Sequence, residues 1–241
     1  VISNGLVLDK NGDKMSKRLG NAVDPFSQID KYGADAVRWY MLTNSQPWDN
    51  LRYDEAGVDE VRRKFFGTLY NTYSFFALYA NLDNFDPKAP AVPYSDRPEI
   101  DRWIISLMNT LIKDVRAAYE DYDVTLAGRL IQDFVCDHVS NWYVRLNRKR
   151  FWGSGSDRDK LAAYQTLYEV LRNIAVLSAP IAPFFMDRLY LDLVPDGEES
   201  VHYAMMPEPD CSLIDKDLEE RMELAQSASS MVLALRRKVN I

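Results

Sequence analysis

The fold class follows from residues 100–122, which read IDRWIISLMNTLIKDVRAAYEDY. Apolar side chains recur in this stretch at intervals of three and four residues, which is the spacing of one face of an α-helix. A stripe of this kind predicts a long helix with one buried side. The side chains expected to face inward are those of Ile100, Trp103, Ile104, Leu107, Leu111, Val115, Ala118 and Tyr122.

Further helices are expected on both sides of this stretch. The apolar spacing predicts helices over about 54–82 and 125–152, a helix capped by Asp157 that stops at Pro180, a short helix over 183–193, and a last helix from about residue 215. Long helices joined by modest loops are typical of a helical bundle, so the chain is predicted to be mainly α. In the helix over 125–152 the expected inward-facing residues are Leu126, Leu130, Phe134, Val139, Trp142 and Leu146.

The helix over 54–82 is dense in aromatic residues. Aromatic side chains at helical spacing can stack on nucleic-acid bases. More often such a stripe is a packed core, because an apolar face of period 3.6 is how a helix buries itself, and we favour that interpretation. The residues concerned are Phe65, Phe66, Tyr70, Tyr73, Phe76 and Tyr79.

Shorter elements are expected near both ends of the chain. Residues 5–8 are strand-like and residues 9–13 have turn chemistry, which together predict a short hairpin. Asp24 followed by Pro25 is a helix-start signal. The remaining expected elements are helices over 25–33 and 35–42 and an extended segment over 201–206.

Composition favours a cytoplasmic globular protein. Of 241 residues, 47% are hydrophobic and 27% charged, and no apolar run approaches the roughly 20 residues of a membrane span. Cys136 and Cys211 form no CxxC pair, which argues against a disulfide framework or a zinc site and fits a reducing cytosol. Because the chain begins at Val1 without an initiator Met, we expect a piece of a longer protein, and we expect it to be a monomer.

Charge is distributed unevenly along the chain. The net charge of −7 argues against a nonspecific polyanion binder. Residues 194–223 hold ten acidic and two basic groups, whereas residues 141–152 hold four basic groups and no acidic one. A local contact with RNA therefore stays open for the basic segments.

A polar loop near the N-terminus carries the clearest chemical signal. Residues 14–21 read KMSKRLGN, which places Lys14 and Lys17 three residues apart. Lysine is a compact, mobile charge that can follow a phosphate as charge moves during a reaction. A solvated basic loop would carry the same charges, so spacing alone leaves both interpretations open. Gly12 and Gly20 permit the mobility that we expect of this loop.

The order of residues in this loop resembles the KMSKS signature of the class I aminoacyl-tRNA synthetases, with Arg18 in place of the last serine. The segments LGNAVDP (19–25) and YGADAVR (32–38) are also similar to that family. NSQPWDNLRY (44–53) and NWYVRLNRKRFW (141–152) resemble the isoleucyl-tRNA synthetases in particular. The valyl, leucyl and methionyl members share the loop and the bundle, so they stay open as alternatives.

The resemblance implies two regions with different tasks. Residues 1–52 would be the loop and stem-contact region of the catalytic domain, and residues 53–241 the anticodon-binding helical bundle. Lys14 and Lys17 would stabilise the phosphates of ATP during attack by the amino acid, with Met15 and Ser16 as further members of the ATP site. Ser16 would hydrogen-bond within the loop or to phosphate. The intact enzyme would use ATP and Mg²⁺ to join isoleucine to its tRNA through an aminoacyl-adenylate.

The isolated piece is expected to be inactive. The family's HIGH motif is absent, and His138 and His202 stand alone in sequence. We expect His138 to be a hydrogen-bonded, partly buried side chain rather than a ligand or base. His202 is expected to be structural or exposed.

Two basic patches are candidate tRNA contacts. The first follows one helix and ends in an aromatic residue, a combination that can bind phosphate and stack on a base. A solvated helix end with favourable dipole charges is the alternative for both patches, and the short basic run 62–64 is a weaker third candidate. The first patch comprises Arg145, Arg148, Lys149, Arg150 and Trp152, and the second Arg236, Arg237 and Lys238.

Two alternatives from other functional classes stay open. A stand-alone helical adaptor would bury its aromatic faces on a protein partner and would need no paired lysines in the loop. The other is a tRNA-binding module whose parent chain has no ligase activity, and a HIGH motif upstream of Val1 would exclude it.

Overall fold

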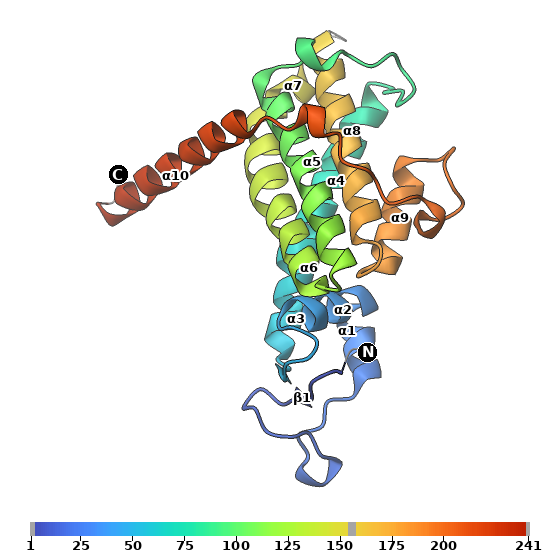
Figure 1. Cartoon of the computed structure of the whole chain (residues 1–241), viewed down its shortest axis with the longest axis vertical. Coiled ribbons are helices and arrows are strands. Elements are labelled where there is room, and N and C mark those ends of the chain that lie inside the picture. The colour runs from blue at the N-terminus through green and yellow to red at the C-terminus, as the bar shows by residue number, and fades with distance from the viewer. Residues whose placement is uncertain (1–2, 154–157, 240–241) are drawn as a thin grey trace.

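The computed structural model describes residues 3–153 and 158–239, and the chain is mainly helical (Figure 1). The strands and α-helices, in chain order, are β1 (Val7–Leu8), α1 (Pro25–Tyr32), α2 (Ala34–Thr43), β2 (Leu51–Arg52), α3 (Glu55–Val61), α4 (Gly67–Leu82), α5 (Glu99–Glu120), α6 (Val124–Asp133), α7 (Arg145–Trp152), α8 (Arg158–Ser178), α9 (Pro183–Leu193) and α10 (Lys216–Lys238). Short 3₁₀ helices cover Lys17–Leu19, Tyr94–Asp96, Val201–Tyr203 and Cys211–Leu213. The predicted mainly α fold is confirmed. The predicted cap at Asp157 lies outside the described residues.

Two long helices contain π-helical segments. Arg62–Phe66 joins α3 to α4, and Phe134–Val144 joins α6 to α7, so that residues 55–82 and 124–152 each run as one continuous helix. Both spans agree with the helices predicted over 54–82 and 125–152. A π turn takes more residues than an α turn, so it rotates the residues that follow to a different side of the helix.

The core of the bundle is built on α5. Trp103, Ile104 and Val115 on this helix are almost fully buried, as the apolar stripe predicts. Helices α6 and α8 pack on it, and α4 lies against α8 and against the π-helical segment that follows α6. The aromatic stripe of the 54–82 helix is also mostly core, since Phe65, Phe66 and Phe76 are buried.

Four residues expected inside lie at the surface instead. Tyr122 follows the end of α5 with a left-handed φ of 58°, which turns its side chain outward. Leu126 is exposed because its neighbour Thr125 takes the buried position and donates to the Leu42 carbonyl at 2.7 Å. Tyr70 and Leu146 are exposed, and both follow a π-helical segment. Beside Leu146, Asn147 is the buried residue and donates to the Tyr143 carbonyl at 2.7 Å.

The N-terminal elements pack directly on the bundle. Asp24 caps α1 by accepting from the Ser27 amide, as predicted. Trp39 of α2 stacks on Phe65 with ring centroids 4.1 Å apart. The Asp35 carboxylate accepts from the backbone amide of Phe185 at 2.5 Å, which ties α2 to the start of α9. The boundary between residues 52 and 53 therefore falls between packed elements, and the division into two domains stays a prediction.

Two expectations near the ends of the chain need correction. β1 pairs with β2 in parallel, so the expected hairpin is reduced to one antiparallel bridge between Leu8 and Lys14. Residues 201–203 form a 3₁₀ helix instead of an extended segment, because the Ser200 hydroxyl caps it by accepting from the His202 amide. No helix in the described residues is long and apolar enough to cross a membrane.

Candidate functional site

The loop with the two lysines begins at a tight turn over residues 9–13. The Asp9 carboxylate accepts from the backbone amides of Asn11 at 3.0 Å and Asp13 at 2.9 Å. Gly12 has a φ of 92°, which an L side chain rarely adopts. The bridge from Leu8 to Lys14 closes the turn. The turn therefore fixes where the chain enters the loop.

Asn21 holds the other end of the loop. Its Oδ1 accepts from the Ser16 amide at 2.8 Å, and its Nδ2 donates to Asp9 Oδ2 at 3.0 Å and to the Lys14 carbonyl at 3.3 Å. The hydrogen bond from Asn21 lowers the pKa of the Asp9 carboxyl, aided by the backbone amides of the turn. Neither Asn21 nor Asp9 was singled out from the sequence. Their signal was the turn chemistry at one end and the LGN segment at the other.

The residues of the motif divide between inside and outside. Met15 is half-buried and packs against the core, whereas Lys14 and Lys17 are exposed. Ser16 accepts from the Arg18 amide at 3.2 Å and so caps the 3₁₀ helix Lys17–Leu19, which is the hydrogen bond within the loop that was one of two expectations. Among the described residues, neither lysine ammonium has an ion-pair partner, so both are available to an anion.

The first basic patch lies at the end of the bundle opposite the loop (Figure 1). Arg145, Arg148 and Lys149 on α7 are exposed, and so is Trp152, whose side chain is 55% exposed. An exposed indole beside cationic side chains can stack on an unpaired base while the cations contact phosphate. These four residues remain a candidate RNA surface.

Arg150 was expected to be part of the first basic patch, but its surroundings differ from those of the other patch residues. Its guanidinium donates to both carboxylate oxygens of Asp101, at 2.6 and 2.9 Å, and to both of Asp159. Asp101 is completely buried and also accepts from the Tyr143 hydroxyl at 2.8 Å. Burial acts against the charged form of Arg150, but these carboxylates raise its pKa on balance. Because its donors are taken up by Asp101 and Asp159, Arg150 joins α5, α7 and α8 and is not part of the exposed basic patch.

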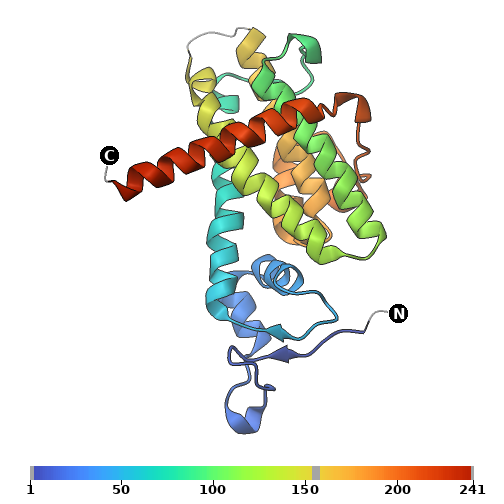
Figure 2. The same ribbon diagram turned by 60° about the vertical axis from the view of Figure 1, so that its left-hand side comes forward.

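The second basic patch lies at the far end of α10. This helix leaves the bundle and projects sideways, with Arg236, Arg237 and Lys238 in its last turn (Figure 2). All three side chains are exposed. The structure therefore keeps the two basic patches on separate elements.

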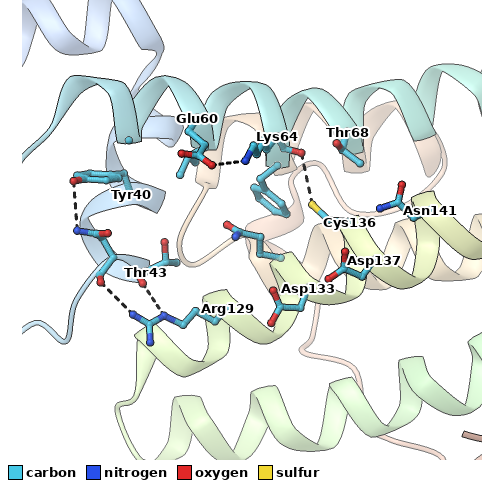
Figure 3. A pocket seen from close by; sticks show the side chains of 15 residues that line it. Tyr40, Thr43, Glu60, Lys64, Thr68, Arg129, Asp133, Cys136, Asp137 and Asn141 are labelled. Atoms are coloured by element: carbon cyan, nitrogen blue, oxygen red, sulfur yellow. Dashed lines mark hydrogen bonds and ion pairs between the residues drawn. The ribbon is translucent and has the colours of Figure 1, made fainter. Parts of the chain in front are cut away.

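A cleft of about 740 Å³ separates α3 and α4 from α6 (Figure 3). Both π-helical segments line it, through Lys64 on one side and Cys136 on the other. Arg129 is held at one end by the carbonyls of Thr43 at 2.8 Å and Asn44 at 3.1 Å. Lys64 donates to the carboxylate of Glu60. The cations in the cleft are thus already engaged by neighbouring groups.

The cysteine in the cleft is not an activated nucleophile. Burial raises the pKa of the Cys136 thiol to about 11, so the sulfur is a protonated thiol at neutral pH. Burial also raises the pKa of the Asp133 carboxyl, with a smaller contribution from Asp137. In the parts of the chain that the structure describes, no group of three or more His, Cys, Asp or Glu side chains is placed to hold a metal ion.

His138 lies next to this cleft but faces the other way. Its ring packs edge-on against Trp103 at a centroid distance of 5.9 Å, and its Nδ1 lies 3.3 Å from Nε2 of Gln226 on α10. The predicted partly buried, hydrogen-bonded histidine is confirmed. His202 is exposed.

Two family models match the chain. Residues 101–241 match the anticodon-binding domain of tRNA ligase, and residues 1–54 match the class I tRNA synthetases for isoleucine, leucine, methionine and valine. The first match covers most of the helical bundle and the second covers the loop.

Curated relatives align over the whole chain. The isoleucine–tRNA ligase of Bacteroides fragilis is 66% identical over 100% of this chain, and that of Porphyromonas gingivalis is 63% identical over the same share. The chain spans only about a fifth of their length, 22% and 21% respectively.

Solved structures share the fold. A leucyl-tRNA synthetase of Agrobacterium radiobacter K84, in a ternary complex with tRNA and LeuAMS, superposes with a TM-score of 0.65 at 24% identity and covers 88% of this chain and 24% of its own. The methionyl-tRNA synthetase of Mycobacterium tuberculosis, in complex with methionyl-adenylate, gives 0.61 at 26% identity, over 75% of this chain and 35% of its own.

Proposed function

The chain belongs to the family of anticodon-binding domains of tRNA ligases, and from this we propose that it is a piece of an isoleucine–tRNA ligase. The piece supplies a loop for the phosphates of ATP and a helical surface for tRNA. The observation that carries this proposal is the 66% identity to an isoleucine–tRNA ligase along the entire chain. The same span holds both the two free lysines and the exposed basic end of the bundle.

Lys14 and Lys17 act on ATP in the intact enzyme. When a carboxylate attacks the α-phosphate, negative charge builds on the phosphate oxygens and on the departing pyrophosphate. Two ammonium groups without internal partners can follow and neutralise that charge. A bound Mg²⁺ would place further positive charge beside the phosphates. Since the described residues offer no metal-binding cluster, we expect ATP and the remaining parts of the ligase to hold the ion. The chain alone is not expected to catalyse.

The tRNA is proposed to contact the α7 end of the bundle. Arg148 and Lys149 supply positive charge there, and Trp152 supplies an exposed ring. The charged contacts position the RNA, whereas contacts to base edges give specificity. We propose that this end reads the anticodon side of isoleucine tRNA, that the protein works as a monomer, and that it resides in the reducing cytoplasm. Cys136 and Cys211 are both free, as that compartment requires.

The test is binding of this chain to isoleucine tRNA and to the same tRNA with a changed anticodon, over a series of salt concentrations. Specific readout predicts tighter binding to the native anticodon, with a shallow dependence on salt. The double variant Arg148→Glu, Lys149→Glu should weaken binding at least about tenfold, since each phosphate contact contributes to the salt-dependent affinity. Charge reversal at Lys113, an exposed residue of α5, is the matched control and should have little effect.

Equal, steeply salt-dependent binding of both tRNAs would contradict anticodon readout by this piece. If the double variant binds tRNA as tightly as the wild type, α7 does not contact the tRNA, and the patch on α10 becomes the next candidate.

A further inference from the structure

Leu8 lies between two residues with long cationic side chains. It pairs with Arg52 in the parallel ladder of β1 and β2, and with Lys14 through the antiparallel bridge. Side chains of directly paired residues stand on the same face of a sheet. With neighbouring strands about 4.8 Å apart, the backbones of Lys14 and Arg52 are about 10 Å apart on one face. Two residues 38 positions apart in sequence are thereby brought to one site.

The alternation along β2 directs Arg52 outward. Leu51 and Tyr53 on either side of it are buried, whereas Arg52 is exposed. Its backbone is fixed, because its carbonyl accepts from the Tyr40 hydroxyl at 2.9 Å, and the Tyr53 amide donates to the Leu8 carbonyl at 2.9 Å. The side chain therefore starts from a rigid point on the same face as Lys14.

The guanidinium of Arg52 lies over the turn that leads into the lysine loop. A Cβ built on Gly12 would be 3.2 Å from Arg52 Nε and 3.4 Å from Arg52 Cζ. Across residues 3–153 and 158–239, this guanidinium makes no hydrogen bond or ion pair. The absent Cβ of Gly12 lets it approach the backbone of the turn closely.

Three nearby carboxylates are committed to other groups. Asp9 is bound by Asn21 and by two amides of its own turn. Asp54 caps α3, and Glu55 accepts from Lys31 at 3.0 Å. These three acids line a pocket together with Tyr53, which points to the opposite face from Arg52. Within the described residues, the side chains of Arg52, Lys14 and Lys17 form no ion pair with these acids or with Asp13, the exposed acid of the same turn.

We propose that Arg52 is a third cationic ligand for the polyphosphate that the lysine loop handles. This inference rests on the proposed ATP-phosphate role of that loop. The backbones of Lys14 and Arg52 are both held against β1, the side chains of all three cations are exposed, and Arg52 offers a planar, bidentate donor pair for phosphate oxygens. Two compact lysine charges and one bidentate guanidinium can together hold a phosphate chain while charge shifts along it.

The test uses inorganic pyrophosphate as the probe and the amide signals of residues 12–20 as the readout in NMR titrations of this chain. Sulfate at matched ionic strength separates binding from screening. Pyrophosphate should shift the loop signals saturably, and Arg52→Met should raise the dissociation constant about tenfold, the effect of losing one charge-assisted contact. Arg52→Lys, which keeps the charge without the bidentate geometry, should give an intermediate value. Arg188→Met, at an exposed arginine of α9, should leave it unchanged.

The outcomes separate this inference from the function that it extends. If Lys14→Met and Lys17→Met weaken pyrophosphate binding but Arg52→Met does not, the role of Arg52 is overturned and the lysine loop stands. If none of the three matters, or if sulfate shifts the signals equally, both the phosphate role of the loop and the role of Arg52 are overturned. If Arg52→Met loses the folded amide spectrum, that variant reports on folding and the test passes to Arg52→Lys. If Arg52→Lys then binds pyrophosphate as tightly as the wild type, the proposal is overturned.

Discussion

Arg148 and Arg150 are two residues apart on α7, yet their surroundings give them different roles. The side chain of Arg148 is exposed, whereas that of Arg150 is only 15% exposed and is enclosed by two carboxylates. Positions i and i+2 on a helix point in different directions, so neighbouring arginines need not share a surface. In a basic run, charge alone does not distinguish a ligand-binding arginine from an internal one.

We predict that Arg150→Met strongly destabilises the chain. The substitution leaves Asp101 buried and uncompensated, and breaking a buried ion pair from one side costs about 3–5 kcal/mol. Urea unfolding measures the loss. Arg148→Met, at an exposed position on the same helix, is the control and should change the free energy of unfolding by less than about 0.5 kcal/mol. A loss below about 1 kcal/mol for Arg150→Met would mean that the network contributes little.

Helix α6 approaches α2 closely at a glycine. A Cβ on Gly128 would lie 2.5 Å from Cγ2 of Thr43 and 3.2 Å from Cδ1 of Ile181. Thr43 is buried and its hydroxyl donates to the Trp39 carbonyl, so it cannot move away freely. This contact joins α2 to α6, and it depends on the absence of one methyl group.

Gly128→Ala should therefore destabilise the chain by about 1–3 kcal/mol, the usual cost of overpacking, although alanine is the better helix former. The matched control is Gly67→Ala at the start of α4. There the nearest atom to a new Cβ is 3.6 Å away, so the same change should be neutral or stabilising by up to about 1 kcal/mol. Thermal unfolding of the two variants tests the difference, and a stabilised Gly128→Ala would contradict the packing argument.

Contact between α10 and the π-helical segment should depend on pH through His138. Burial lowers the pKa of this histidine, against the opposing effect of Asp137, Asp133, Glu223 and Glu219. Because the folded pKa is below the unfolded value of about 6.5, protonation favours the unfolded chain. The neutral His138 therefore contributes its full stabilisation above about pH 6.5. This stabilisation is lost as the pH falls from there through the lowered pKa of the folded chain.

Urea unfolding at about pH 7 and about pH 5 tests this prediction. The wild type should lose more stability than His138→Phe over this interval, since phenylalanine cannot take up the proton. Equal losses in the two proteins would assign the acid sensitivity to other groups.

The whole molecule is a bundle with a candidate site at either end and one projecting arm. The lysine loop lies at one end and the exposed basic surface of α7 at the other, while α10 extends sideways (Figures 1 and 2). The first turns of α10 are bound to the bundle. Leu218 is buried, and Glu219 accepts from the hydroxyls of Ser106 at 2.5 Å and Thr110 at 2.9 Å.

Removing residues 228–241 should leave the melting temperature within about 2 °C of the wild type, because the side chains of this part of α10 are mainly exposed. Removing residues 216–241 also takes away Leu218 and Glu219, and should lower the melting temperature by about 5–10 °C. Equal melting temperatures for the two truncations would show that the start of α10 is not part of the core.

The local sequence was enough to predict most helices and to identify the candidate loop. The apolar stripe of α5, the Asp24 cap and the Lys14–Lys17 pair depend on residues close in sequence, and the structure keeps the stripe, the cap and the outward lysines. Helix spacing, capping and short-range charge act within a few residues, so they can be recognised without the fold.

Whether particular side chains point inward or outward was decided by how the helices and strands pack in the folded chain. Two π-helical segments rotated the helix faces that follow them, which placed Leu146 outside and Asn147 inside. The burial of Asp101 decided that Arg150 is internal, and the pairing of β1 with β2 brought Arg52 to the lysine loop. Such contacts join residues tens of positions apart, and their energies depend on which groups lose water when the helices pack. That information exists only once the chain has folded.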